Sequence, residues 1–92
     1  MEVRVRVPTP LRRFTVGKDE VPAEGASLRA IIDNLEVRHA GLRERLLDDK
    51  GEIRRFVNIY LNGDDVRFLD QLNSKVKDGD EISIVPAIAG GN

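Results

Sequence analysis

Only one stretch of this chain has the apolar spacing of a long amphipathic helix. Its apolar residues follow the i, i+3, i+4, i+7 pattern that places them on one face, and they are Leu28, Ile31, Ile32 and Leu35. Ser27 is the expected N-cap, and the helix should run through Val37 or His39 and stop near Gly41. With one long helix, the apolar face must pack against a sheet, and that sheet must be small enough for one helix to cover.

Polar and apolar residues alternate at the start of the chain with the period of a strand. This strand spans residues 2–7, and it should turn Val3, Val5 and Val7 toward the core while Arg4 and Arg6 face water. Pro8-Thr9-Pro10 ends it, because proline cannot donate a ladder hydrogen bond. A weaker strand-like run at residues 13–16 precedes a turn at residues 17–19, so we predict an N-terminal hairpin.

The strongest strand signal covers residues 55–61, which are rich in β-branched and aromatic side chains and end at an Asn-Gly pair. A last strand is expected at residues 81–85, after the Asp78-Gly79-Asp80 turn. The residues of these two strands that should face the core are Val57, Ile59, Leu61, Ile82 and Ile84.

Two shorter segments connect these elements. Residues 42–47 should form a short turn or helix and residues 66–72 a connection. The leucines expected to be buried there are Leu42, Leu46, Leu69 and Leu72. Strands on both sides of one helix predict an α+β fold, a mixed sheet with one main helix on one face. The fold is of the β-grasp type if this helix is the crossover that brings a later strand parallel to the first. A ferredoxin-like sandwich would need a second long helix, which the turn residues within 62–78 disfavour. We predict one domain at residues 1–86 and a flexible tail at residues 87–92.

The composition excludes several classes of function. Fifteen Lys and Arg against 16 Asp and Glu give a formal net charge of −1, which offers no electrostatic support for nucleic-acid binding. No apolar run approaches the roughly 20 residues that span a bilayer, and the first six residues lack the apolar segment of a signal peptide, so we expect a cytoplasmic protein without membrane contact. The absence of cysteine excludes disulfides, thiolate metal sites and a cysteine nucleophile.

Few side chains suggest chemistry of their own. His39 is the only histidine, and near a helix C-terminus it favours a structural role, because the helix dipole stabilises a cation there. The acidic clusters at residues 19–20, 48–49, 64–65 and 78–81 have the composition of turns and lack the spacing of a calcium loop. Gly17-Lys18 lacks the spaced glycine and hydroxyl residue of a phosphate-binding loop. We therefore predict no metal site and no catalytic residue within the chain.

Two aromatic residues fall on the face opposite the core. The alternation that buries Val57 and Ile59 turns Phe56, Asn58 and Tyr60 outward. They either cover the sheet as cross-strand pairs, with Phe14 or the stems of Arg4 and Arg6 over them, or form a surface that docks a partner. The sequence leaves both interpretations open.

The end of the chain, after Pro86, holds small residues around Ile88 and then Gly90-Gly91. Glycine contributes little to stability, but a segment without Cβ atoms can enter a narrow channel and bring its carbonyl close to a nucleotide or a thiol. We therefore expect an extended tail that can enter the narrow active-site channel of a partner.

The sequence resembles the ubiquitin-like sulfur carriers of the MoaD/ThiS group, and most closely the CysO type that serves cysteine biosynthesis. Three blocks carry the resemblance across the whole domain: residues 3–9, residues 55–62 with 65–68, and residues 78–91, of which the last is the most specific. The resemblance implies a β-grasp fold and a reactive carboxylate on Gly91, next to Gly90. Blocks that the group shares do not fix the pathway, so molybdopterin and thiamine synthesis stay open, as does a ubiquitin-like protein modifier.

The resemblance also implies partners. A ubiquitin-activating-like enzyme would adenylate Gly91 with ATP, a sulfur donor would displace AMP to leave a thiocarboxylate, and a pyridoxal-phosphate enzyme of the cysteine synthase type would accept the sulfur. The carrier would bind no cofactor and would not itself be an enzyme. We predict that its docking surface comprises Phe56, Tyr60, Val66, Arg67 and Ile88.

The sequence departs from this group at one position. Asn92 follows Gly91, whereas the active form of such carriers ends in Gly-Gly. A peptidase should therefore cut between Gly91 and Asn92, and a zinc metalloprotease is the candidate. Two alternatives are that Asn92 is not a native residue or that the protein is not a carrier.

Overall fold

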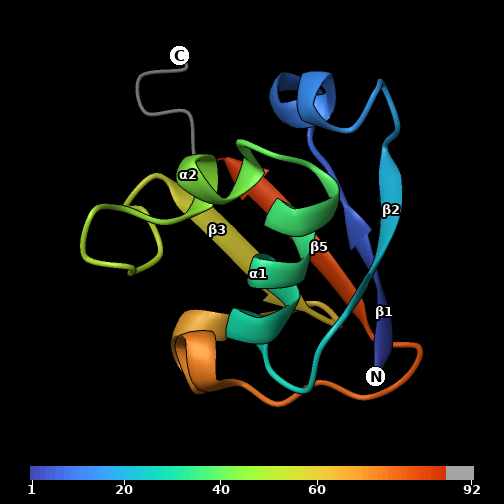
Figure 1. Ribbon diagram of the computed structural model, residues 1–92. Helices are drawn as coiled ribbons and strands as arrows, with labels where there is room; N and C mark the ends of the chain where they lie inside the picture. Colours follow the sequence, from blue (N-terminus) through green and yellow to red (C-terminus); the bar gives the residue numbers. More distant parts are fainter. Residues whose placement is uncertain (87–92) are drawn as a thin grey trace.

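The computed structural model describes residues 1–86, so the predicted tail at residues 87–92 lies outside the described part of the chain. One sheet in the order β2-β1-β5-β3-β4 carries helix α1 on one face (Figure 1). The strands are β1 (Glu2–Arg6), β2 (Glu20–Glu24), β3 (Val57–Leu61), β4 (Asp64–Asp65) and β5 (Glu81–Pro86). The sheet is mixed, because β1 and β5 pair in parallel while the other neighbours are antiparallel. The predicted architecture is confirmed.

The N-terminal hairpin exists, but its second strand is not where the sequence pattern placed it. Residues 13–16 do not form a strand: Thr9–Phe14 is a 3₁₀ helix, η1, and β2 begins only after the turn. Pro10 near the start of η1 has a φ suited to a helical turn, and its missing N–H is no loss there. Val16 then adopts a φ of 56°, which no strand residue takes.

The two α-helices match the prediction closely. Helix α1 spans Leu28–Arg38, with the Ser27 hydroxyl accepting a hydrogen bond from the Ala30 N–H and with His39 as C-cap. Gly41, at φ 98°, then leads into α2 (Leu42–Leu46), which buries its two leucines. Glycine suits this position because L side chains rarely adopt such a positive φ.

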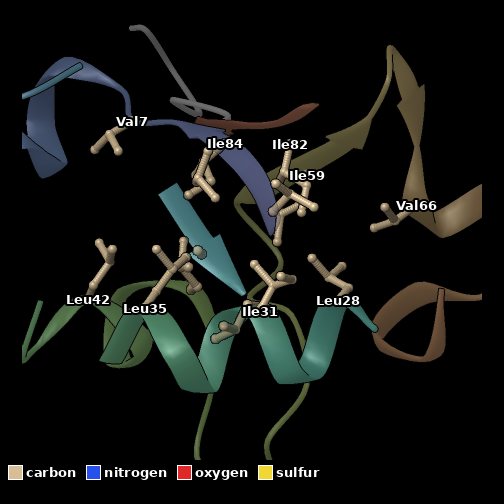
Figure 2. Packing of buried hydrophobic residues seen from close by; sticks show 14 of the residues in the cluster. Val7, Leu28, Ile31, Leu35, Leu42, Ile59, Val66, Ile82 and Ile84 are labelled. Atoms are coloured by element: carbon tan, nitrogen blue, oxygen red, sulfur yellow. The ribbon is translucent and has the colours of Figure 1, made fainter. Parts of the chain in front are cut away.

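The core lies between α1 and the covered face of the sheet. Figure 2 shows Leu28, Ile31 and Leu35 of α1 facing Ile59 of β3 and Ile82 and Ile84 of β5. All six side chains are at most 4% exposed, as are the inward valines of β1. Burying side chains of this size contributes about 1.5–3 kcal/mol each, so this layer dominates stability.

The second half of the chain contains a strand and two 3₁₀ helices that the sequence pattern did not resolve. Asn62 and Gly63 turn the chain at positive φ into the two-residue strand β4. The 3₁₀ helices are η2 (Val66–Phe68) and η3 (Gln71–Asn73). Leu72 is buried as predicted, but Leu69 is 47% exposed, because Val66 and Leu72 take the inward positions of the two turns. Within residues 1–86, none of the helices has both the length and the apolar character needed to cross a membrane.

Candidate functional site

The candidate site lies at the end of β5, where the described chain stops. Pro86, the last residue of β5, is the register partner of Val57, the first residue of β3. The predicted reactive residues Gly90 and Gly91, the predicted docking residue Ile88 and the processing residue Asn92 lie outside the described residues. The structure therefore defines the surroundings from which these residues depart.

The open face of the sheet presents a mixed polar and apolar surface beside this point. Asn58 of β3 lies opposite Val85 of β5, and Tyr60 lies opposite Ser83. Phe56 is 55% exposed and Val85 is 43% exposed, whereas Tyr60 is half-buried. Val85 was not among the predicted site residues, although the alternation that turns Ile84 inward is the signal that would have identified it.

The structure separates the two interpretations left open for the outward aromatics. Phe14 does not cover Tyr60; its ring lies against Gly41 between α1 and α2, where a Cβ on that glycine would come within 3.0 Å of it. On the open face, Ser83 of β5 lies between its register partners, Arg6 of β1 and Tyr60 of β3. Arg6 is therefore two strands away from Tyr60, and its guanidinium donates to Glu81 at 2.6 Å, while Phe56 stays exposed.

Arg67 has an internal role that the sequence did not reveal. Its guanidinium donates to the Asn58 side-chain oxygen at 2.8 Å, to the Val57 carbonyl at 2.8 Å and to the Arg54 carbonyl at 3.0 Å. Strand β4 pairs only with the last two residues of β3, so it does not reach this part of the edge. Arg67 thus caps the first residues of β3, directly across the strand pair from Pro86.

One of the predicted docking residues is misplaced. Val66 is 1% exposed and packs in the core, so its side chain is not available to a partner, and its inclusion in the docking surface was wrong. The reason is η2, whose first residue points inward while the chain turns. Phe68, two residues later, is 87% exposed and was not predicted. A short 3₁₀ turn has no long periodicity from which this orientation could be inferred.

A carboxylate organises the helical junction near the same end. Glu36 of α1 accepts hydrogen bonds from the backbone N–H groups of Gly41 at 3.1 Å and Arg43 at 3.0 Å. These bonds from Gly41 and then Arg43 hold the pKa of Glu36 below its ordinary value, because they stabilise the ionised form. Glu36 therefore satisfies the free N–H groups at the start of α2.

The acidic clusters hold turns together. Asp80 accepts from the Lys77 N–H at 2.8 Å and from the Asn62 side chain at 3.0 Å, and Asp78 accepts from the Glu2 N–H at 2.8 Å. Within residues 1–86, the structure contains no group of three or more His, Asp or Glu side chains that could hold a metal ion.

Known proteins share both the sequence and the fold. Sulfur carrier protein CysO of Mycobacterium tuberculosis is 47% identical over 93 residues, which cover 99% of this chain and 100% of that protein. A chain in the crystal structure of the Amycolatopsis orientalis BexX/CysO complex superposes with a TM-score of 0.91 at 48% identity, covering 97% of this chain and 99% of that one. Small archaeal modifier protein 3 of Haloferax volcanii is 37% identical over 68 residues, 74% of this chain and 73% of that protein.

A mixed sheet that packs one main helix, with a last strand leading to a Gly-Gly segment, defines a ubiquitin-like protein of the β-grasp class. The ThiS family pattern matches residues 5–91. The chain belongs to the ThiS family of ubiquitin-like sulfur carriers.

Proposed function

We propose that this protein carries sulfur as a thiocarboxylate on Gly91, most directly for cysteine biosynthesis. The observation that carries the proposal is the similarity to CysO over the full length of both chains. The family match supports the same site, because it extends to Gly91 and leaves out Asn92. We place this chemistry in the cytoplasm, where its partners and ATP would be found.

The proposed cycle has two steps, both catalysed by a partner. The Gly91 carboxylate attacks the α-phosphorus of ATP, so that an acyl adenylate forms and pyrophosphate leaves. A sulfide-level donor then attacks the acyl carbon, forming a C–S bond as AMP departs. An unbranched glycine leaves this carbon open to both attacks. The carrier contributes the carboxylate and a docking surface, while ATP and the catalytic groups belong to the activating enzyme.

Asn92 has to be removed first, because an amide on Gly91 offers no carboxylate to adenylate. We assign this cut to a peptidase, with a zinc metalloprotease as the candidate. A pyridoxal-phosphate enzyme of the cysteine synthase type is the proposed acceptor of the sulfur.

Intact-mass spectrometry tests the proposal on two matched chains, residues 1–92 and residues 1–91, each incubated with the activating enzyme, ATP and sulfide. We expect only the shorter chain to gain the mass change of one oxygen replaced by sulfur. Protein from its native cells should end at Gly91. A native population that keeps Asn92, together with a 1–91 chain that never gains sulfur, would overturn the proposal.

A second candidate is supported by the similarity to small archaeal modifier protein 3. Gly91 would then form isopeptide bonds to lysines of other proteins. Immunoblots of native cells distinguish the two functions: conjugates that resist thiol reduction and disappear when Gly91 is deleted favour a modifier. The two functions share the adenylation step, so such conjugates would extend the carrier proposal without replacing it.

A further inference from the structure

Two arginines from different elements share one aromatic ring near the end of β5. The guanidinium carbons of Arg13, in η1, and Arg45, in α2, lie 4.9 and 5.4 Å from the centroid of the Phe14 ring. The ring is itself held in place, because it packs against Gly41. Both arginine side chains belong to exposed residues. The structure therefore presents two positive groups in a fixed arrangement on the surface.

Neither arginine takes part in an ion pair within the described residues. Ion pairs among residues 1–86 join Arg6 to Glu81, Arg38 to Glu24 and Arg43 to Asp33, and none of them includes Arg13 or Arg45. The carboxylates of Glu36 and Asp48 accept from backbone N–H groups. Since the whole chain has a formal net charge of −1, this basic cluster reflects local separation of charge and not a basic protein.

The cluster lies at the end of the molecule from which the tail departs. Strand β1 runs parallel to β5 with Arg6 opposite Ser83, so the chain that continues into η1 follows the last residues of β5. Helix α2 contacts η1, and in Figure 1 both lie toward the end of the molecule at which β5 stops. A partner that takes up the tail would therefore meet this surface.

We propose that Arg13 and Arg45, arranged by Phe14, dock an acidic surface of the enzyme that activates the tail. A guanidinium that lies over a ring can still donate N–H groups to a carboxylate, and Arg offers two parallel donors for this purpose. Two arginines that share a ring also repel each other, and carboxylates of a partner relieve that repulsion. This inference rests on the proposed function, because it names the chemistry of the partner's surface.

The test compares charge reversal at this cluster with charge reversal at the opposite end. Arg13→Glu/Arg45→Glu removes the cluster. Arg29→Glu is the matched control, because Arg29 is exposed in the first turn of α1, where an acidic residue suits the helix dipole. Binding of each 1–91 chain to the activating enzyme is measured by calorimetry without ATP, so the result does not depend on adenylation.

We expect the double variant to bind at least tenfold more weakly, the control to bind as wild type, and the difference to shrink at high salt. The affinity of Arg13→Lys/Arg45→Lys should lie between those of the double variant and wild type, since lysine keeps the charge but loses the two parallel donors of the guanidinium. If the double variant does not fold, Arg13→Gln/Arg45→Gln replaces it. This variant should also bind more weakly than wild type, but by a smaller factor.

Equal affinity of the charge-reversed and wild-type chains overturns the inference, and so does an equal loss in Arg29→Glu. A wild-type chain that binds but is never adenylated overturns the proposed function and leaves this inference standing on its binding data. A wild-type chain that does not bind the enzyme overturns both.

Discussion

Different sets of hydrogen bonds hold the segments at the two ends of the sheet. At the end where β5 begins, side-chain oxygens accept from backbone N–H groups: Asp78 from Glu2, Asp80 from Lys77, and Asn62 from Glu81. At the end where β5 stops, arginines donate to backbone carbonyls: Arg12 to Val7, Arg54 to Glu44, and Arg67 to Arg54 and Val57. Figure 1 places these two ends at opposite sides of the molecule.

This difference shows that the same structural task can leave different surfaces. Tight turns expose N–H groups that short acidic side chains satisfy at close range. The junctions around η1, α2 and the start of β3 also expose carbonyls, which long arginine side chains reach, while Glu36 accepts from the N–H groups at the start of α2. As a consequence, arginine side chains gather at the end at which the tail departs, although the chain as a whole is nearly neutral.

The largest expected loss of stability follows from a substitution at Gly41, at the end of the molecule where the tail departs. Gly41→Val places a β-branched residue at φ 98° and a Cβ within 3.0 Å of the Phe14 ring. Strain of both kinds should cost about 3 kcal/mol in the free energy of unfolding. Denaturant unfolding measures the loss. Gly63→Val has a positive φ but an open surrounding, so it is the control and should cost less.

Removing the cap of β3 should have the next largest effect. Arg67→Ala leaves the carbonyls of Val57 and Arg54 without this donor, and the half-buried site should lose about 2 kcal/mol. Hydrogen exchange should rise at the start of β3 and the end of β5 and stay unchanged at the Asn62 turn. Arg55→Ala, at an exposed position, is the matched control; an equal effect there would show that the cap is unimportant.

A smaller loss is expected at the opposite end. Asp80→Ala removes acceptors for the Lys77 N–H and the Asn62 side chain, at a cost of about 1 kcal/mol because the turn is largely solvated. Its hydrogen-exchange pattern should be the reverse of that of Arg67→Ala, with faster exchange at residues 77–81. Exchange that accelerates equally at both ends would contradict the view that the two ends are held independently.

The smallest expected effect is a pH dependence of stability that arises from Glu36, at the end where the tail departs. Because the pKa of Glu36 is lowered in the folded state, its contribution is present at neutral pH and is lost as the pH falls through the ordinary carboxyl range toward the lowered value. Glu36→Gln should therefore be destabilised at pH 7 and approach wild type in acid. Chemical unfolding at a series of pH values measures the difference, and a constant difference between the two proteins would exclude this role.

Periodic segments were predictable from the sequence. The inward valines of β1, the capped helix α1 and the inward isoleucines of β3 and β5 were all inferred correctly, because burial on one face leaves a regular pattern. The second strand was misplaced, since Phe14 and Val16 have strand-like character but follow two prolines that start a 3₁₀ helix. Local turn geometry overrode propensity there.

The site was predictable only in part. Gly91 stands out in the sequence, and its role stays a prediction because it lies outside the described residues. Val66 and Leu69 were assigned the wrong exposure, because the 3₁₀ turns that orient them are too short to leave a pattern. Arg67 and the ring shared by Arg13 and Arg45 depend on contacts between residues distant in the chain, and no local pattern indicates such contacts.

The parallel pairing of β1 with β5 has a consequence for how the protein is made. The central strand of the sheet is the last to be synthesised, and it joins the first strand to β3. A nascent chain that has not yet released residues 81–86 can form the hairpin and the helix but has no strand to unite them. Contacts this far apart in sequence also slow folding, since their loop-closure entropy is lost before the core forms. Ribosomes that stop early therefore release a chain that cannot complete its fold, and the tail is presented only on a finished domain.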